Sequence, residues 1–326
     1  MSETPAVPLP PPPWTRAQRE ALGSAYVQGH LPHALMIHES PGSGGEWLAL
    51  WCAQLVLCET HAAAPCGKCR ACTRVAANQH PDLTWIAPED NSRQLKIEQV
   101  RALGQELSLT SHGGGYKVAV LTPADLLNRF AANALLKTLE EPAPRTLLIL
   151  VVTQPSRLPA TILSRCQRIR VAAPLRAESL AWLTQARGAN AWAAALDTVG
   201  EAPLSIVGFD PAELAAVGAE ARRALDTLAA READPVATAE RWARSELSLR
   251  LQCFENWLTE RIRRAEREGV FMTEMRAGPY LSQGAPVLNI RELFRLVDEV
   301  RELRATLDVP LNRGVALESL FRRLAS

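Results

Sequence analysis

The chain has 326 residues, of which 47% are hydrophobic and 22% charged, and its formal net charge is +1. This length predicts roughly two or three domains, and the composition is that of an ordinary globular protein. The near-zero charge argues against a protein that coats DNA, which needs a basic face, although it leaves room for a local basic patch. The longest strongly apolar run, Leu147–Val152, is far too short to cross a bilayer.

The N-terminal part predicts a leader followed by a helix and a strand. Residues 1–13 are rich in proline and predict a loose leader. They contain no basic region followed by an apolar stretch, so we expect no signal peptide and a cytoplasmic location. Trp14–Gln28 has apolar residues at helical spacing, and His33–Ile37 predicts the first strand.

The glycine-rich segment after this strand has the shape of a phosphate-binding loop. A turn and then a predicted helix, Trp47–Leu57, follow the strand. In a working loop, backbone N–H groups surround the phosphates, a lysine reaches them, and a serine or threonine holds Mg²⁺. Here the lysine position holds Gly45 and the hydroxyl position holds Glu46. We expect a degenerate and empty loop, formed by Pro41, Gly42, Ser43, Gly44 and Gly45.

Four of the seven cysteines lie within fifteen residues, namely Cys58, Cys66, Cys69 and Cys72. In a chain expected to be cytoplasmic, such a cluster indicates a metal rather than disulfides. Four thiolates can surround Zn²⁺ tetrahedrally and leave no open position, which predicts a structural zinc. His61 is an alternative to Cys58 as a ligand, and free buried cysteines are the alternative to a metal site.

The next hundred residues alternate between strands and helices. The expected elements are strand Thr84–Ile86, helix Ile97–Leu107, strand Lys117–Leu121, helix Leu126–Glu141, strand Thr146–Thr153, a short helix or turn Ile162–Cys166 and strand Gln167–Val171. This alternation, with strands that are apolar on both faces, predicts a doubly wound α/β domain with a parallel sheet over residues 14–173.

A nucleotide-hydrolysing domain also needs acidic residues at the end of a second strand, where they hold Mg²⁺. The strand ending at Leu121 is followed by Thr122 and Pro123 instead. Asp125 remains, and we expect it to cap the next helix rather than bind a metal. Because two matched features are lost together, the sequence predicts a domain that folds like an ATPase and does not hydrolyse ATP.

Beyond Pro174 no convincing strand occurs, and Ala, Leu, Arg and Glu dominate at helical spacing. We expect a small helical domain over residues 174–208 and a larger one over 209–326. The larger domain is expected to hold roughly four to six longer helices.

Arg165, on a predicted turn in Ser164–Cys166, is a candidate catalytic residue. An arginine at a domain edge can reach into a neighbouring subunit's nucleotide site and stabilise the γ-phosphate. An ordinary surface arginine is the simpler interpretation of this residue by itself.

Taken together, several stretches resemble the bacterial DNA polymerase III clamp-loader subunits of the AAA+ class. These are Leu31–Leu35, the Cys66–Cys72 module, His80–Asp82, Ile97–Arg101, Ala131–Pro142 and Ser164–Cys166. The resemblance is close over about residues 30–172 and loose beyond. It implies an AAA+ type parallel sheet domain with an inserted zinc module at 58–72, a helical lid domain and an all-α collar domain that joins subunits.

Within this class, the motor subunits (gamma and tau) have intact nucleotide loops, and the departures at Gly45, Glu46 and Thr122 favour a non-hydrolysing kind of subunit. The resemblance then implies that Arg165 is an arginine finger toward ATP on a neighbour and that Thr153 occupies the first sensor position. The implied partners are the motor and delta subunits, the sliding clamp and, through the complex, primed DNA, with no membrane. No catalysis by this chain itself is expected, although the holoenzyme is a DNA-directed DNA polymerase.

Two other functions stay open at this point. The first is an active ATPase motor with an irregular loop, although the nearest lysines, Lys68 and Lys96, lie outside it. The second is a zinc-containing nucleic-acid-binding module, which would bind DNA in a salt-dependent manner. For packing between collar domains the candidates are Trp242, Leu249, Phe254, Trp257 and Leu258, for which an ordinary core is an equally good interpretation.

Overall fold

The computed structural model describes residues 9–89, 94–188, 191–267, 290–307 and 312–325. The chain divides into two compact units, Met1–Trp182 and Leu183–Ser326, which are described separately below. The three-domain division with boundaries near residues 174 and 209 stays a prediction. In the part of the chain that is described, no helix is long and apolar enough to span a membrane.

The first unit contains a five-stranded sheet in which every pairing is parallel. Its strands are β1 (Ala34–Glu39), β2 (Leu83–Ile86), β3 (Lys117–Leu121), β4 (Thr146–Val152) and β5 (Gln167–Val171), in the order β2-β3-β4-β1-β5. Every residue of β3 and β4 is buried, as both faces of a parallel sheet require. The predicted mixed α/β architecture with a parallel sheet is confirmed.

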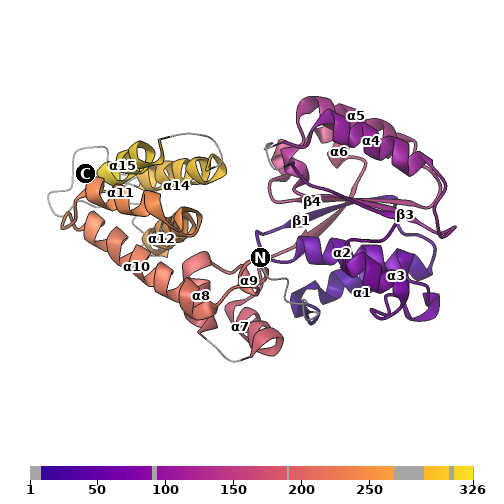
Figure 1. The fold of residues 1–326 in the computed structure, drawn as a ribbon, viewed down its shortest axis with the longest axis horizontal. Helices are drawn as coiled ribbons and strands as arrows, with labels where there is room; N and C mark the ends of the chain where they lie inside the picture. Colours follow the sequence, from indigo (N-terminus) through magenta and orange to yellow (C-terminus); the bar gives the residue numbers. More distant parts are fainter. Residues whose placement is uncertain (1–8, 90–93, 189–190, 268–289, 308–311, 326) are drawn as a thin grey trace. The chain divides into compact units, whose positions relative to one another are not determined.

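Helices cover both faces of this sheet (Figure 1). On one face lie α1 (Arg16–Val27), α2 (Gly45–Leu57) and α3 (Arg70–Ala76), and on the other lie α4 (Ile97–Ser108), α5 (Arg129–Glu140) and α6 (Ala160–Leu163). Short 3-10 turns complete the unit: η1 (Pro13–Thr15), η2 (His61–Ala63), η3 (Ala124–Leu126) and η4 (Pro155–Arg157).

The alternation of side chains along β1 separates two hydrophobic cores. Leu35 and Ile37 join the core under α1, α2 and α3, whereas Ala34 and Met36 join the core under α4, α5 and α6. This is the period-two pattern of a strand. Since fully burying one large apolar side chain contributes about 1.5–3 kcal/mol, the two cores together hold the sheet and its helices in place.

The predicted helix over Leu126–Glu141 is wrong at its start. The segment Ala124–Leu126 forms the separate turn η3, and α5 begins at Arg129. Its N-cap is Asn128, whose side chain accepts a hydrogen bond from the Ala131 N–H at 2.8 Å. An asparagine directly before the first turn satisfies a free N–H group. Asp125 therefore does not cap this helix.

The described residues of the second unit form helices joined by turns, with no strand among them. Its helices are the end of α7 (Arg176–Arg187), α8 (Trp192–Val199), α9 (Pro203–Ile206), α10 (Pro211–Ala229), α11 (Pro235–Arg244), α12 (Leu247–Arg267), α14 (Ile290–Ala305) and α15 (Arg313–Leu324). Side chains of Asp210, Asp234 and Asn312 cap α10, α11 and α15.

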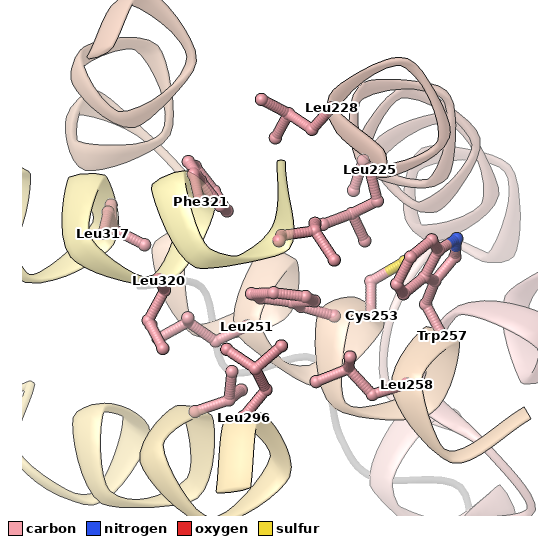
Figure 2. Close-up of a cluster of buried hydrophobic side chains, with 14 of the residues drawn as sticks. Leu225, Leu228, Leu251, Cys253, Trp257, Leu258, Leu296, Leu317, Leu320 and Phe321 are labelled. Carbon is pink, nitrogen blue, oxygen red and sulfur yellow. The ribbon is translucent and has the colours of Figure 1, made fainter. Parts of the chain in front are cut away.

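Figure 2 shows the hydrophobic core of this unit, where side chains from α10, α12, α14 and α15 converge. The Phe321 ring lies 5.0 Å from Trp242 and 5.8 Å from Phe254, centroid to centroid. Trp242, Phe254, Trp257 and Leu258 are all buried in this core. Of the five side chains considered for packing between subunits, these four pack within their own unit, while Leu249 is partly exposed.

Candidate functional site

The glycine-rich loop lies between the end of β1 and the start of α2, at the edge of the sheet where its parallel strands end. Gly42 and Gly44 have φ angles of 70° and 101°, which strongly favour glycine. The helix α2 begins at Gly45 directly after this turn. The strand–loop–helix geometry of a phosphate-binding loop is therefore present, with backbone N–H groups at a helix N-terminus.

These N–H groups already have a partner from the same chain. One carboxylate oxygen of Glu39 accepts hydrogen bonds from the backbone nitrogens of Gly44, at 3.0 Å, and Gly45, at 2.6 Å. Glu39 is only 9% exposed. Burial raises the pKa of Glu39, the nearby charges of Glu46 and Asp125 raise it further, and the two N–H groups partly offset this rise.

Glu39 is a site residue that was not predicted, although the motif contains the signal. In the pattern G-x-x-x-x-G-K-[ST], aligning the last three positions on Gly44, Gly45 and Glu46 places the first glycine on Glu39. The loop thus departs from the motif at a third position besides the two already described. An added Cβ at Gly45 would lie 2.8 Å from the Glu39 carboxyl carbon, so the glycine at 45 leaves space for this carboxylate.

The other two departures contact each other. The hydroxyl of Thr122, at the end of β3, donates a hydrogen bond of 2.6 Å to a carboxylate oxygen of Glu46, in the first turn of α2. Thr122 is buried at 3% exposure. The position of a Mg²⁺-binding hydroxyl thus holds a carboxylate, the position of a Mg²⁺-binding carboxylate holds a hydroxyl, and the two side chains bond directly.

Asp125 joins η3 to the end of β4. Its carboxylate accepts hydrogen bonds from the Thr153 hydroxyl at 3.0 Å, the Gln154 N–H at 3.2 Å and the Thr153 N–H at 3.5 Å. The prediction that Asp125 caps a helix is therefore wrong, because these three donors after β4 take its acceptor capacity. Thr153, expected at a sensor position, donates to Asp125.

The loop is also bonded on its outer side. The indole N–H of Trp14, in η1, donates to the Ser43 carbonyl at 2.7 Å. Trp14 packs edge-to-face on Trp182 with centroids 5.6 Å apart, and the Trp182 N–H donates to the Pro10 carbonyl at 2.9 Å. The end of the proline-rich leader thus folds against the loop through two tryptophans.

The two lysines considered above for phosphate binding lie outside this loop. Lys96 pairs with Glu89 at 2.7 Å, and Lys68 lies in the turn between Cys66 and Cys69, in the cysteine cluster. A third lysine, Lys117, donates to the Glu106 carbonyl at 2.6 Å from the first residue of β3, the opposite end of that strand from Thr122.

The four cysteines predicted to bind a metal come together, with all Sγ atoms within 4.8 Å of one another. Cys58 follows the end of α2, and Cys69 is the N-cap of α3. Tetrahedral zinc with Zn–S bonds of about 2.3 Å separates its sulfurs by roughly 3.8 Å, and Cys58 and Cys69 are already 3.9 Å apart. The cluster could hold a metal ion.

Backbone N–H groups favour the thiolate form of Cys66, which is the form that binds a metal. N–H groups of Lys68 and Cys69 lower the pKa of Cys66 to about 6, whereas burial raises the pKa of Cys58 and Cys72. A metal favours the thiolate form of all four. His61, the alternative ligand, lies instead with its Nδ1 3.5 Å from the Tyr26 hydroxyl.

Arg165 lies between α6 and β5 and is partly exposed, with 36% of its side-chain surface accessible. One guanidinium nitrogen lies 2.7 Å from the Glu140 carboxylate at the end of α5. Another donates to the Thr161 carbonyl at 2.9 Å. The guanidinium is thus held near the surface by two partners from its own unit.

Comparison with known proteins gives consistent relatives. A family described as "DNA polymerase III, delta subunit" matches residues 14–174. The DNA polymerase III subunit delta' of Pseudomonas aeruginosa PAO1 is 34% identical over 322 residues, covering 96% of this chain and 97% of the relative. The delta' subunit of Escherichia coli K12 is 38% identical over 174 residues, about half of each chain. The tau subunit of Escherichia coli K12 is 34% identical over 154 residues, covering 47% of this chain and 24% of the relative.

Proposed function

The chain belongs to the family of DNA polymerase III delta' subunits, and we propose that it is the non-hydrolysing subunit of a clamp-loader ring. Residues 14–173 form the AAA+ domain, 174–208 the lid and 209–326 the collar that joins it to its neighbours. Its partners are the motor (gamma or tau) and delta subunits, the sliding clamp and primed DNA. Its role is to hold the neighbouring subunits of the ring in position and to supply the guanidinium group of Arg165 to a neighbouring ATP site.

The observation that carries this proposal is the direct bond between Glu46 and Thr122. In a hydrolysing site these two positions hold the Mg²⁺ ion and polarise its surroundings. Here they bond to each other at 2.6 Å. A carboxylate at position 46 also repels a triphosphate, and Gly45 offers no side chain to neutralise it. The loop therefore lacks each charged group that ATP hydrolysis requires.

Arg165 is proposed to act in trans as an arginine finger toward ATP on the adjacent motor subunit. Its ion pair with Glu140 is about half exposed, and such pairs contribute only about 0–1 kcal/mol. The guanidinium can therefore exchange its partner for a γ-phosphate at little cost. Bidentate contact with phosphate oxygens is the chemistry for which arginine is suited.

The test is ATP hydrolysis by the purified chain, alone and mixed with the motor and delta subunits of the same organism. We expect no turnover by the chain alone and DNA-stimulated turnover by the complex. Arg165→Ala should lower turnover at the site it faces by about 10-fold or more, because an arginine finger contributes a large factor to kcat. Arg165→Lys should restore it only in part, since lysine lacks the planar fork.

A matched control is Arg168→Ala, which removes an exposed arginine from the neighbouring strand β5. It should leave turnover unchanged. Equal turnover in the Arg165→Ala and parent complexes would remove the finger assignment. Turnover by the chain alone would replace the proposal with the active-motor alternative, and salt-dependent DNA binding by the chain alone would support the nucleic-acid-binding alternative.

The cysteine cluster is proposed to hold a structural zinc. Its four thiol ligands complete a tetrahedral shell and leave no position for a substrate. The ion would join the end of α2 to the start of α3. The identity of the metal is testable by metal analysis of the protein purified without added zinc.

A further inference from the structure

We propose that Glu39 is an internal ligand of the phosphate loop, which takes the place of a phosphate and holds the loop in its anion-cradling form without nucleotide. This inference deepens the proposed function, because it concerns the same loop and explains how the loop stays ordered when it is empty. It goes beyond the loss of the lysine and the hydroxyl. Those losses weaken nucleotide binding, whereas an internal carboxylate excludes the phosphate from its position.

The first support is the identity of the donors. The N–H groups of Gly44 and Gly45, which bond Glu39 at 3.0 and 2.6 Å, stand at the N-terminus of the 13-residue helix α2. The partial positive charge of a helix N-terminus and its free N–H groups favour an anion at this place. A carboxylate oxygen reproduces the charge and the hydrogen-bond acceptors of a phosphate oxygen.

The second support is the space around the carboxylate. Gly45 has no side chain, and a Cβ there would collide with Glu39 at 2.8 Å. Glu39 itself replaces the first glycine of the motif. A glycine at position 39, as in the motif, would leave space for a phosphate. In this chain the Glu39 side chain occupies that space, and the absence of a side chain at Gly45 makes this possible. The two departures are therefore complementary in shape.

The third support is that the loop is also held from its other side. The Trp14 N–H donates to the Ser43 carbonyl at 2.7 Å, and the Ser40 N–H donates to the Val171 carbonyl at 3.1 Å. These bonds, together with those to Glu39, tie the loop to η1, β1 and β5. Nucleotide is not needed to order a loop that is held by its own chain on both sides.

A tethered carboxylate competes strongly with a free anion, because its effective local concentration is high at any ligand concentration. The nearby negative charges of Glu46 and Asp125 act in the same direction. The parent chain should therefore bind inorganic pyrophosphate and ADP only weakly. Removing the Glu39 carboxylate should expose two N–H donors to solvent.

The experiment compares the parent with Glu39→Gly, which restores the glycine of the motif, and Glu39→Gln, which keeps the shape and removes the charge. Binding of inorganic pyrophosphate and ADP is measured by calorimetry and by the shift in Tm. We expect Glu39→Gly to bind pyrophosphate about 10-fold or more tightly than the parent, the factor of one charge-assisted hydrogen bond. Equal binding by the two proteins overturns the inference.

A second measurement does not depend on the stability of the glycine variant. Hydrogen exchange of the peptide spanning residues 40–47 is followed in the parent and in Glu39→Ala, which removes the acceptor, without any ligand. We expect the amides of Gly44 and Gly45 to exchange about 10-fold or more slowly in the parent, since each is bonded to a carboxylate. Unprotected amides in the parent would also overturn the inference.

These outcomes separate the inference from the proposed function. If Glu39→Gly binds pyrophosphate no better than the parent while Arg165→Ala still lowers turnover by the complex, Glu39 is not an internal ligand and the clamp-loader role stands. If Glu39→Gly binds pyrophosphate more tightly while Arg165→Ala leaves turnover by the complex unchanged, the role of Glu39 as an internal ligand is supported. The role of Arg165 as an arginine finger is then rejected.

Discussion

At the scale of single residues, three carboxylates determine the chemistry around the loop, and each is engaged within the chain. Glu39 accepts from the loop backbone, Glu46 accepts from Thr122, and Asp125 accepts from Thr153 and Gln154. In a hydrolysing site, acidic side chains at the ends of these strands would face Mg²⁺. Here Glu39 bonds the start of α2, Glu46 connects α2 to the residue after β3, and Asp125 connects η3 to the residues after β4.

Asp125 gives a stability prediction at this scale. Asp125→Ala leaves the Thr153 hydroxyl and two backbone N–H groups without their acceptor in a largely buried place. We expect the free energy of unfolding to fall by about 1–3 kcal/mol, the cost of unsatisfied buried donors. Urea unfolding measures this change. Asp125→Asn keeps one carbonyl oxygen and should lose less, and an alanine variant as stable as the parent would contradict the bonding described.

At the scale of elements, the segment between α2 and α3 contains the cysteine cluster and few other buried residues. The 3-10 turn η2 in this segment has no buried residue, and two of the cysteines, Cys58 and Cys72, are buried. A short segment of this kind has little apolar area with which to order itself, and the proposed metal would contribute free energy of folding there. The proposed metal would thus order the connection between two helices on the same face of the sheet.

The cysteine cluster predicts a pH dependence. Metal binding displaces protons from thiols, so affinity falls as pH falls. Cys66, with a pKa of about 6, is largely ionised at pH 7, whereas Cys58 and Cys72, whose pKa values are raised, are protonated there in the absence of metal. We therefore expect the proposed zinc to be lost as pH is lowered below neutrality, because protons displace the metal from its thiolate ligands.

Zinc release measured with a chromogenic chelator across this pH range tests the prediction. Cys72→Ser should lower zinc retention at every pH, while Cys166→Ser, which changes a thiol outside the cluster, should leave it unchanged. Retention that is independent of pH, or equal loss in both variants, would contradict a four-thiolate site.

At the scale of the whole molecule, the two compact units are stabilised by different kinds of hydrophobic core. The first unit has a core on each face of a central sheet, and the second has a large core between helices. Three aromatic rings, Trp242, Phe254 and Phe321, meet in the second core. They come from α11, α12 and α15, so this core joins the consecutive helices α11 and α12 to a helix about 45 residues further along the chain.

Phe321→Ala should therefore destabilise the second unit. The ring is fully buried, and removing a buried phenylalanine costs about 3–5 kcal/mol through lost burial and the cavity that remains. Thermal unfolding followed by tryptophan fluorescence measures the change. Val315→Ala, on the same helix but at a residue that is 59% exposed, should change Tm little. Similar losses in both variants would contradict the core described.

Much of this organisation could be predicted from the sequence, because it follows from local periodicity and spacing. The apolar runs of β3 and β4 predicted buried parallel strands, the spacing of Cys58, Cys66, Cys69 and Cys72 predicted their cluster, and the motif run Ala131–Pro142 indicated the family. Each of these signals lies within a short stretch of chain, where side-chain period and turn chemistry act directly.

Only the tertiary structure decided which polar groups meet in the loop. Glu46 and Thr122 are 76 residues apart, and Asp125 and Thr153 are 28 apart. Their contact depends on the strand order β2-β3-β4-β1-β5, which brings the ends of β1, β3 and β4 together. Glu39 is close to its glycines in sequence, but its role depends on two positive φ angles that turn the backbone N–H groups back toward it. Hydrophobic periodicity carries no information on such contacts, because a hydrogen bond is set by position in space.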